Sequence, residues 1–573
     1  MLNPIIKMWR CKYWCKILLI ILILVWVSIS FYTIGPLWKT NKDTDHLMEE
    51  LIQANAEIEH LRKTIHELSP DKRASNIHIV NQQSLNNGNE RVNELNSPST
   101  EYEQTRRRLY RDINEYWWYI QGFLEPFSRN KDITASEIYS NISHQINKVL
   151  IEGRHRHDTL LSVLDDLSEA DGYNRWRENE AIELSNLVQK RIYALQNPND
   201  CSSAKKLVCN INKLCGFGCQ IHHVVYCFIL AYGTERTLVL TSKDWRYNRG
   251  GFEQVFKPVS ETCSATSLEN KQKQPWPWDS DAQIVDVPII EYLNPKPEFL
   301  PPAIPEDLSD RIIRLHGDPV VWWISQFVKY LLRPQNSTAQ FLSDLEVTND
   351  LSNPIVGVHI RRTDKLEKEA SLHEVDEYMR YVSEYFQQVE TNTGAIVSPK
   401  RVYIASDDPG VFSEARKNYP RFEFLGDESR ADSAKVQSRY NLKSLQGLIA
   451  DIYMLSRSEY IVCTFSSQVC RLAYEIQQQL YSDGSWRFKS LDDVWYFGNS
   501  DHQQEVILPH NAATDEELNL EIGDVLSVAG NHWNGYNKGR KHGDEEQLGL
   551  YPLYKTKEKY KIVAFPTYPE VVL

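Results

Sequence analysis

The sequence has no excess of positive charge. Its 573 residues include 64 Lys and Arg against 77 Asp and Glu, giving a formal net charge of -13 at pH 7. This balance argues against nonspecific nucleic-acid binding, so a phosphate ligand requires a local basic site. The chain is 42% hydrophobic and 11% aromatic, so most of it can bury cores. Its length corresponds to roughly four domains.

The chain also lacks a cleavage site after its long apolar N-terminal run. Residues 17–34 carry no charge and are just long enough to cross a membrane. Basic residues precede the run, so the positive-inside rule predicts a cytosolic tail at 1–16, a signal anchor at 17–38 and a remainder beyond the membrane. A cleaved signal peptide is the alternative, but no small-x-small motif follows.

The cysteine spacing does not match a common zinc finger. Two of the ten cysteines precede the anchor, and the other eight, an even number, lie where disulfides are expected. Cys463 and Cys470 stand apart from the rest, so we expect them to bridge each other. Zinc remains an alternative for the crowded group, which has C-x3-C spacing and lies near His222 and His223. That group is Cys201, Cys209, Cys215, Cys219, Cys227 and Cys263.

Helical patterns follow the anchor. Residues 39–69 carry a heptad seam, which predicts a self-associating coiled coil, with an amphipathic helix packed on its own domain as the alternative. Residues 70–100 are polar and Asn-rich and predict a flexible linker. Residues 101–200 predict further helices, in which one stripe is expected to be a packed face. The seam is Leu47, Leu51, Ala54, Ile58, Leu61, Ile65 and Leu68, and the stripe is Leu109, Ile113, Tyr116 and Ile120.

From 201 to 498 short apolar runs alternate with helical ones, which predicts an α/β region with a parallel sheet. The runs interpreted as strands include HHVVYCFILAYG, RTLVLTS, PIVGVHI, RVYIASDD and YIVCTFSSQ. Ligands of such sheets bind at the carboxyl ends of the strands. A Pro-rich insert at 294–307 separates early strands from late ones and indicates a lobe junction. Residues 499–573 have short strands and turn residues, which predict a small β-barrel.

Two clusters at strand ends suit an anionic ligand. Arg361 and Arg362 follow a strand, and guanidinium groups match phosphate oxygens in shape and charge. A structural pairing with Asp364 and Glu369 is the alternative. The second cluster, Ser466–Gln468, lies between a strand and a helix, where backbone N–H groups attract an anion. Plain N-capping by Ser467 is its alternative.

Other carboxylates are less specific. Asp407 and Asp408 end a strand, and Asp279-Ser-Asp281 is a D-x-D triplet that would suit a divalent metal. A charge pair in a turn is the commoner explanation for both. Asp451 interrupts an apolar helix, where a carboxylate needs a donor such as a base edge or an arginine.

Five blocks in order resemble one family: CNINKLCGFGCQIHHVVYC, WRYNRGGFE, VGVHIRRTDK, CTFSSQVCRLAYEI and VAGNHWNGY. They are similar to the α1,6-fucosyltransferases that add core fucose to N-glycans. The resemblance implies a type II Golgi membrane enzyme that uses GDP-fucose, inverts the anomeric centre and needs no metal. It also implies a glycosyltransferase-B-like nucleotide-binding parallel sheet.

The resemblance implies roles for individual residues. Arg361 corresponds to the ligand of the β-phosphate, with Arg362 supporting it, His359 near the nucleotide and Asp451 reading guanine. Gly216 and Gly218 with Phe217 correspond to a loop that approaches the donor, and Tyr247 corresponds to a donor contact. Ser467 and Gln468 correspond to contacts with the donor or the acceptor. Leu214 departs from the pattern, because the family has a glycine there. Glu369 corresponds to the catalytic base, coupled to Lys365, and Asp407 and Asp408 to supports of the arginines.

The end of the chain resembles an SH3 domain, with Glu517-Leu518, Gly523-Asp524 and Gly549–Pro552 in the matching places. The resemblance implies that this barrel helps to hold the glycan or a homodimer. The implied sugar contacts are Lys213, Asp492, Asp493 and His532, and the implied bridges are Cys201 with Cys263, Cys209 with Cys227, Cys215 with Cys219 and Cys463 with Cys470. Two alternatives stay open at this point: a fucosyltransferase acting on protein Ser or Thr, and a catalytically dead membrane-anchored adaptor.

Overall fold

The computed structural model describes residues 97–129, 137–268, 271–351, 354–363, 371–435, 438–492, 502–532 and 534–568. All of them belong to one compact unit, Asn96–Leu573. The predicted tail, anchor, coiled coil and most of the linker lie outside the described residues. Within these ranges, no helix combines the length and the apolar character that a membrane span requires.

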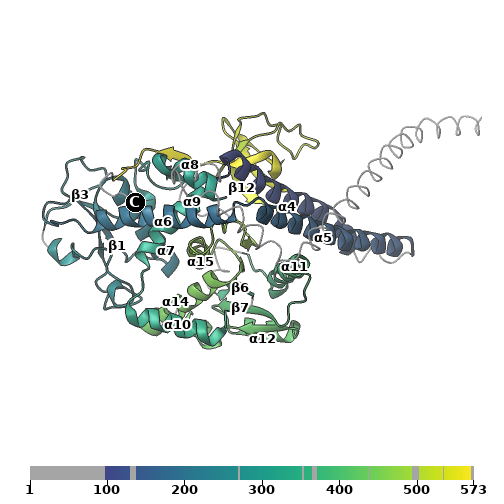
Figure 1. The fold of residues 1–573 in the computed structure, drawn as a ribbon, viewed down its shortest axis with the longest axis horizontal. Coiled ribbons are helices and arrows are strands. Elements are labelled where there is room, and N and C mark those ends of the chain that lie inside the picture. The colour runs from purple at the N-terminus through teal and green to yellow at the C-terminus, as the bar shows by residue number, and fades with distance from the viewer. Residues whose placement is uncertain are drawn as a thin grey trace, which may run out of the picture. The chain divides into compact units, whose positions relative to one another are not determined.

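Three long helices begin the described chain, as the pattern over 101–200 predicts. They are α4 (Thr100–Arg129), α5 (Glu137–Ala170) and α6 (Asn174–Gln196). Figure 1 shows α4 and α5 side by side. Two members of the predicted packed stripe are exposed: Leu109 is 47% and Tyr116 is 68% accessible. That prediction is wrong for both, because α4 buries the adjacent face, which carries Trp117, instead.

A first parallel sheet has the strand order β2-β1-β4-β3. Its strands are β1 (Lys206–Asn210), β2 (Thr237–Thr241), β3 (Gln274–Pro275) and β4 (Ile284–Val287). The run HHVVYCFILAYG is not a strand but most of helix α7 (Phe217–Gly233). Nearly the whole helix is buried, so its sequence shows no polar face, and periodicity alone does not separate such a helix from a buried strand.

A second parallel sheet has the order β10-β9-β6-β7-β8. The Pro-rich insert lies between the two sheets in sequence, as predicted. The strands are β6 (Ile355–Ile360), β7 (Lys400–Ser406), β8 (Phe422–Leu425), β9 (Tyr460–Cys463) and β10 (Phe488–Ser490). The two parallel sheets confirm the predicted α/β class.

Helices connect and cover the strands (Figure 1). In the sequence, three helices lie between the strands of the two sheets: α8 (Glu306–Leu315), α9 (Pro319–Leu331) and α10 (Asn336–Asn349). Within the second sheet's segment lie α11 (Val375–Thr393), α12 (Gly410–Asn418), α13 (Glu428–Ser433), α14 (Leu442–Arg457) and α15 (Gln468–Gln477). One hydrophobic core joins α7, α9, α14 and α15, so the two α/β halves share buried contacts.

The C-terminal part contains an antiparallel five-stranded sheet in the order β14-β13-β12-β11-β15. Its strands are β11 (Gln503–Val506), β12 (Val525–Asn531), β13 (Tyr536–Lys541), β14 (Asp544–Pro552) and β15 (Thr556–Glu558). The next strand, β16 (Lys561–Val563), pairs instead with β5 (Ala303–Pro305) in the α/β part. The predicted barrel range of 499–573 therefore extends beyond the barrel.

Candidate functional site

The strand register places two charged clusters opposite each other. Ile360 at the end of β6 pairs with Ser406 at the end of β7, so Arg361 and Asp407 emerge side by side. The Asp407 carboxylate accepts hydrogen bonds from the Arg361 guanidinium, from the Thr363 hydroxyl and, at 2.8 Å, from the Arg362 backbone N–H. Because Asp407 is only 4% exposed, it holds Arg361 at the edge of the sheet.

The Arg362 guanidinium lies among three carboxylates. Its nitrogens are 3.0 Å from Glu414, 3.2 Å from Glu374 and 3.6 Å from Asp408. These groups balance its charge and fix its position, which suits a support for Arg361 better than a direct ligand of a second anion. The alternative partners Asp364 and Glu369 lie outside the described residues, as does Lys365.

The ends of β9 and β10 lie at the same edge of the sheet as those of β6 and β7. Cys463 at the end of β9 pairs with Ser490 at the end of β10. Asp492, just beyond β10, accepts hydrogen bonds from the Ser466 backbone N–H at 3.2 Å and from the Ser490 hydroxyl at 2.9 Å. The loop before α15 is thereby fixed. Ser467 makes no side-chain capping bond, so the plain capping alternative is wrong.

The N-terminus of α7 meets the N-terminus of α15. A Cβ atom on Gly218 would lie 2.7 Å from the backbone carbonyl carbon of Gln468, so only glycine permits this approach. The Phe217 N–H donates to the Tyr247 hydroxyl at 2.9 Å, and Tyr247 is 3% exposed. Three distant segments thus bring together Gly218, Tyr247 and Gln468, beside Gly216 and Ser467. Two helix N-termini at one place favour negative charge.

Neither Gly216 nor Leu214 makes a close contact like that of Gly218 with Gln468. A Cβ on Gly216 would meet nothing within 4 Å. Leu214, which departs from the family pattern, is 92% exposed. His359 lies on β6 and is 5% exposed, two residues before the strand-end arginine.

Asp451 has an arginine partner, one of the two kinds of donor that its helix position requires. Its Oδ1 accepts from the Tyr403 hydroxyl at 2.8 Å and from Arg430 at 3.1 Å. Burial raises the pKa of Asp451 to about 6, while Arg430 and Tyr403 act in the opposite direction. Its side chain keeps 13% exposure.

The predicted sugar contacts are not all brought together. Asp492 lies at the site edge, as described above. Lys213 forms an ion pair with Glu291 at 2.5 Å, three residues before Gly216. His532 is exposed in the barrel, where its backbone N–H donates to the Tyr536 carbonyl at 3.2 Å. Asp493 lies outside the described residues.

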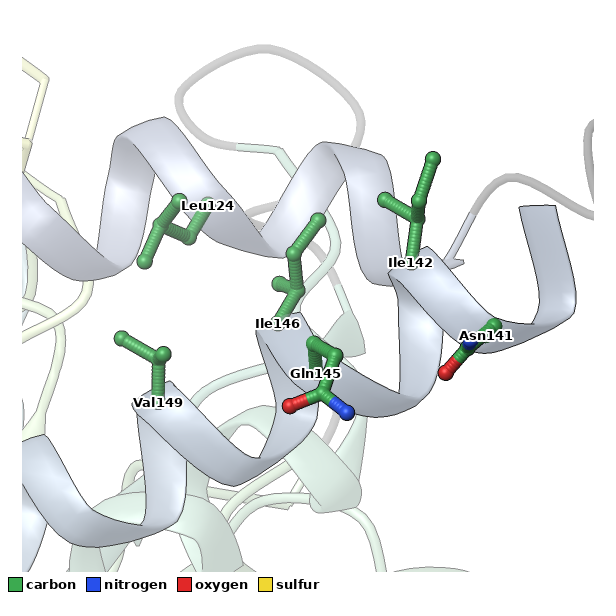
Figure 2. Close-up of a pocket in the computed structure, with 6 residues that line it drawn as sticks. All are labelled: Leu124, Asn141, Ile142, Gln145, Ile146 and Val149. Atoms are coloured by element: carbon green, nitrogen blue, oxygen red, sulfur yellow. The ribbon is translucent and has the colours of Figure 1, made fainter. Parts of the chain in front are cut away.

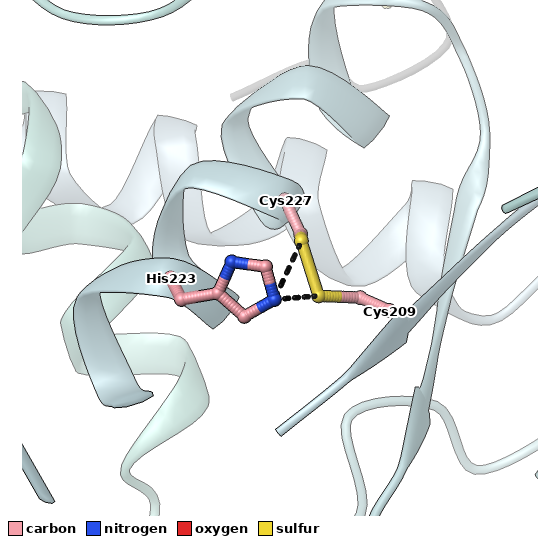
Figure 3. Close-up of side chains that lie close together, drawn as sticks. All are labelled: Cys209, His223 and Cys227. Atoms are coloured by element: carbon pink, nitrogen blue, oxygen red, sulfur yellow. Dashed lines mark hydrogen bonds between the residues drawn. A yellow bond between two sulfur atoms is a disulfide. The ribbon is translucent and has the colours of Figure 1, made fainter. Parts of the chain in front are cut away.

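The four disulfides are those that the family resemblance implies. Figure 3 shows Cys209 and Cys227 joined to each other, with the Nε2 of His223 3.5 Å and 3.9 Å from their sulfurs. Burial lowers the pKa of His223 to about 4. Because both sulfurs are covalently bonded, zinc is the wrong interpretation of these cysteines.

The D-x-D residue Asp279 accepts a hydrogen bond from Gln274 at 2.8 Å.

Sequence reasoning missed a buried pair behind the helix junction. His222 on α7 lies between Glu475 and Gln468, both on α15. The adjacent histidines in an apolar run were visible, but their partners lie about 250 positions away in the chain, with separations of 246 and 253 residues. No local pattern connects them.

Fold and site define an α/β protein with an arginine pair at the carboxyl ends of parallel strands. Residues 7–496 match the family of alpha-(1,6)-fucosyltransferase N- and catalytic domains. The chain therefore belongs to this family and is a fucosyltransferase. It is 48% identical over 472 residues to an alpha-(1,6)-fucosyltransferase of Drosophila melanogaster, covering 82% of this chain and 75% of the relative.

A second relative and one solved structure complete the comparison. An alpha-(1,6)-fucosyltransferase of Caenorhabditis elegans is 38% identical over 432 residues, covering 75% of this chain and 77% of the relative. The crystal structure of fucosyltransferase NodZ from Bradyrhizobium is 15% identical, covers 47% of this chain and 92% of that chain, and has a TM-score of 0.31. The structural likeness is too weak to bear on the fold.

Proposed function

We propose that this enzyme transfers fucose from GDP-fucose to the 6-hydroxyl of the innermost GlcNAc of N-glycans, with inversion and without a metal ion. The observation that carries the proposal is the contact of Gly218 with Gln468, which brings two helix N-termini to the strand edge that bears Arg361. This arrangement suits a leaving diphosphate. The names of the two relatives, alpha-(1,6)-fucosyltransferases, support the linkage.

The donor site uses charge and backbone donors. Arg361 neutralises the β-phosphate, and Asp407 and Arg362 keep its guanidinium in position. Backbone N–H groups of the first turns of α7 and α15 contact the phosphate oxygens, apart from that of Phe217, which donates to Tyr247. Tyr247, Ser467 and His359 line the nucleotide, and Asp451 accepts hydrogen bonds from the N–H groups of guanine.

The chemistry is a displacement at the sugar's anomeric carbon. The acceptor's 6-hydroxyl oxygen forms a bond to C1 of fucose as the bond from C1 to the diphosphate oxygen breaks on the opposite face, which inverts the centre. Glu369 takes the hydroxyl proton, with Lys365 coupled to it, and the bonding electrons leave with GDP. Arg361 stabilises the charge that develops on the diphosphate, because preorganised cations act most strongly where charge appears. We propose no role for a metal in this step.

The acceptor approaches from the side of β10 and the barrel. Asp492 and Asp493 follow β10, Lys213 precedes the α7 junction, and His532 lies on the barrel. We propose that the barrel is SH3-like and contacts the glycan or a second copy of the chain, in place of the Pro-rich peptides that ordinary SH3 domains bind. The two lobes then form a glycosyltransferase-B-like arrangement around the donor.

The helical segment is proposed to form a homodimer. Along α4, apolar side chains at helical spacing are exposed: Leu109, Tyr116, Phe123 and Phe127 at 47%, 68%, 59% and 51%. Figure 2 shows a neighbouring hollow of about 380 Å³, lined by Leu124 and by Asn141, Ile142, Gln145, Ile146 and Val149 of α5. If α4 and α5 of a second copy packed against this helix pair, the exposed stripe of α4 and the hollow would both be buried. The proposed anchor at 17–38 and coiled coil at 39–69 would hold that dimer in the Golgi membrane, with the catalytic part luminal.

One assay tests the function. The protein without its first 38 residues is incubated in EDTA with GDP-fucose and a defined N-glycan, and with a Ser/Thr-containing protein acceptor in parallel. We expect fucose on the 6-hydroxyl of the innermost GlcNAc only. Fucose on the protein hydroxyl would support the alternative transferase, and strict manganese dependence would contradict the metal-free step.

A further inference from the structure

A buried histidine bridges the two helices whose N-termini form the proposed donor site. The Nε2 of His222 is 3.1 Å and 3.0 Å from the two carboxylate oxygens of Glu475, and its Nδ1 is 2.9 Å from Oε1 of Gln468. His222 is 3% exposed and Glu475 is 0% exposed. The bridge is therefore sealed from water and joins α7 to α15.

The hydrogen bonds define how this bridge holds Gln468. An amide oxygen only accepts hydrogen bonds, so Nδ1 of His222 donates to Oε1 of Gln468, while Nε2 faces the Glu475 carboxyl group on the other side of the ring. A buried carboxyl group also needs a hydrogen-bond partner, and the His222 ring supplies it. With its Oε1 engaged, Gln468 keeps both hydrogens of its Nε2 for other acceptors.

Gln468 is also the residue that contacts Gly218, at the first position of α15. Its backbone is held by that contact and its amide by His222. Neither Glu475 nor His222 lies at a helix N-terminus: Glu475 is seven residues along α15, and His222 is five residues into α7. Both act at a distance from the edge of the sheet.

We propose that Glu475 and His222 are positioning residues that fix the Gln468 amide with its NH2 group toward the diphosphate of the donor. The inference rests on the proposed function, because it assigns an anionic ligand to this edge. If His222 accepted at Nδ1 instead, the amide would turn and present its oxygen to the phosphate. Glu475 holds the far side of the ring, so that Nδ1 stays directed at Oε1 of Gln468.

The test is a double-mutant cycle of Glu475→Gln and Gln468→Ala, read by calorimetric binding of GDP and by the donor KM and kcat. Each single change should weaken GDP binding about tenfold, as expected for the loss of one charge-assisted hydrogen bond. The double variant should bind no more weakly than Gln468→Ala alone, because Glu475 acts through that amide. The donor KM should rise while kcat at saturating donor stays within about twofold.

A matched control lies at the other end of the same helix. Gln478 accepts a hydrogen bond from buried His316 at 3.0 Å. Gln478→Met removes a buried His–Gln contact of the same kind, so it should lower the melting temperature and leave the Kd for GDP unchanged. Additive losses in the cycle, or an unchanged Kd in Glu475→Gln, would overturn the proposal.

If Glu475→Gln does not fold, Gln468→Glu tests the same proposal. Its carboxylate can still accept from Nδ1 of His222, so the fold should persist, but it places negative charge toward the phosphate. GDP binding should be about tenfold weaker than in Gln468→Ala, and binding equal to that of the unmodified enzyme would contradict the inference. Failure of the unmodified enzyme to bind GDP would instead contradict the proposed function itself.

Discussion

Arg361 and Asp407 emerge from the ends of neighbouring parallel strands, and the guanidinium of one donates to the carboxylate of the other. Asp407 also accepts the Arg362 backbone N–H, so one nearly buried carboxylate organises both residues of the arginine pair. An arginine fixed in this way needs no reorganisation when charge develops on a leaving diphosphate.

Arg361→Ala should reduce kcat/KM for GDP-fucose at least about 100-fold, because the cation opposite the leaving group is lost. Arg361→Lys should recover only part of this activity, since an ammonium does not reproduce the planar fork. Steady-state kinetics with melting temperatures check both. Arg362→Lys is the matched control and should cost less, and equal losses in the two lysine variants would show that the pair has no division of roles.

Gly218→Ala should abolish measurable GDP binding and lower the stability by about 1–3 kcal/mol, because the new methyl group meets the backbone of Gln468. Gly216→Ala, two residues earlier, has open space at its Cβ and should be tolerated. Calorimetry and thermal unfolding distinguish the two. If the variants behave alike, the close contact of α7 with α15 does not shape the donor site.

The donor KM should depend on the charge of Asp451. Its pKa is raised to about 6 by burial, so it is ionised above that pH and protonated below it. Only the ionised form accepts both guanine N–H groups, so the donor KM should rise as the pH falls from 7 to 5. Arg430→Met removes a cation that lowers this pKa, so the rise should begin at a higher pH.

The matched variant is Asp451→Asn, whose donor KM should be high and should not show this inflection near pH 6. The folded-state pKa lies above the unfolded value of 3.8, so ionisation of Asp451 opposes folding, with a cost that grows from there to about pH 6 and is constant at higher pH. Unfolding experiments should therefore show that Asp451→Asn relieves this cost at pH 8 more than at pH 5. A pH profile identical in all three proteins would remove Asp451 from the donor site.

Phe123→Glu should convert a dimer to a monomer without preventing GDP binding, because it places charge in the exposed apolar stripe of α4. Ile396→Glu changes an even more exposed side chain, at 87%, outside that stripe and should leave the dimer intact. Sedimentation velocity compares the two. A monomeric parent protein, or dimers in both variants, would contradict an interface on helices α4 and α5.

Much of the second sheet was predictable because its signals are local. The strand PIVGVHI and the arginines that follow it are adjacent in sequence, and parallel strands bring their carboxyl ends to one edge. That Asp407 supports Arg361 was implied by the family resemblance, and the structure shows the contact between them. The spacing predicted the bridge of Cys463 with Cys470, and the resemblance supplied the other three bridges and the residue roles.

Other features depend on which faces become buried. Helix α7 was predicted as a strand because a helix buried on all sides shows no amphipathic period. On α4, the apolar stripe was assigned to the core, yet the structure buries the face with Trp117 and leaves Tyr116 exposed. The pairing of His222 with Glu475 depends on how two distant helices meet, which no local pattern encodes.

The most direct test of the account is a crystal structure of the enzyme with bound GDP. We predict that the β-phosphate lies within hydrogen-bond distance of the Arg361 guanidinium and at the joined N-termini of α7 and α15. GDP bound elsewhere, with Arg361 directed only at Asp407 and away from the phosphate, would contradict the central claim.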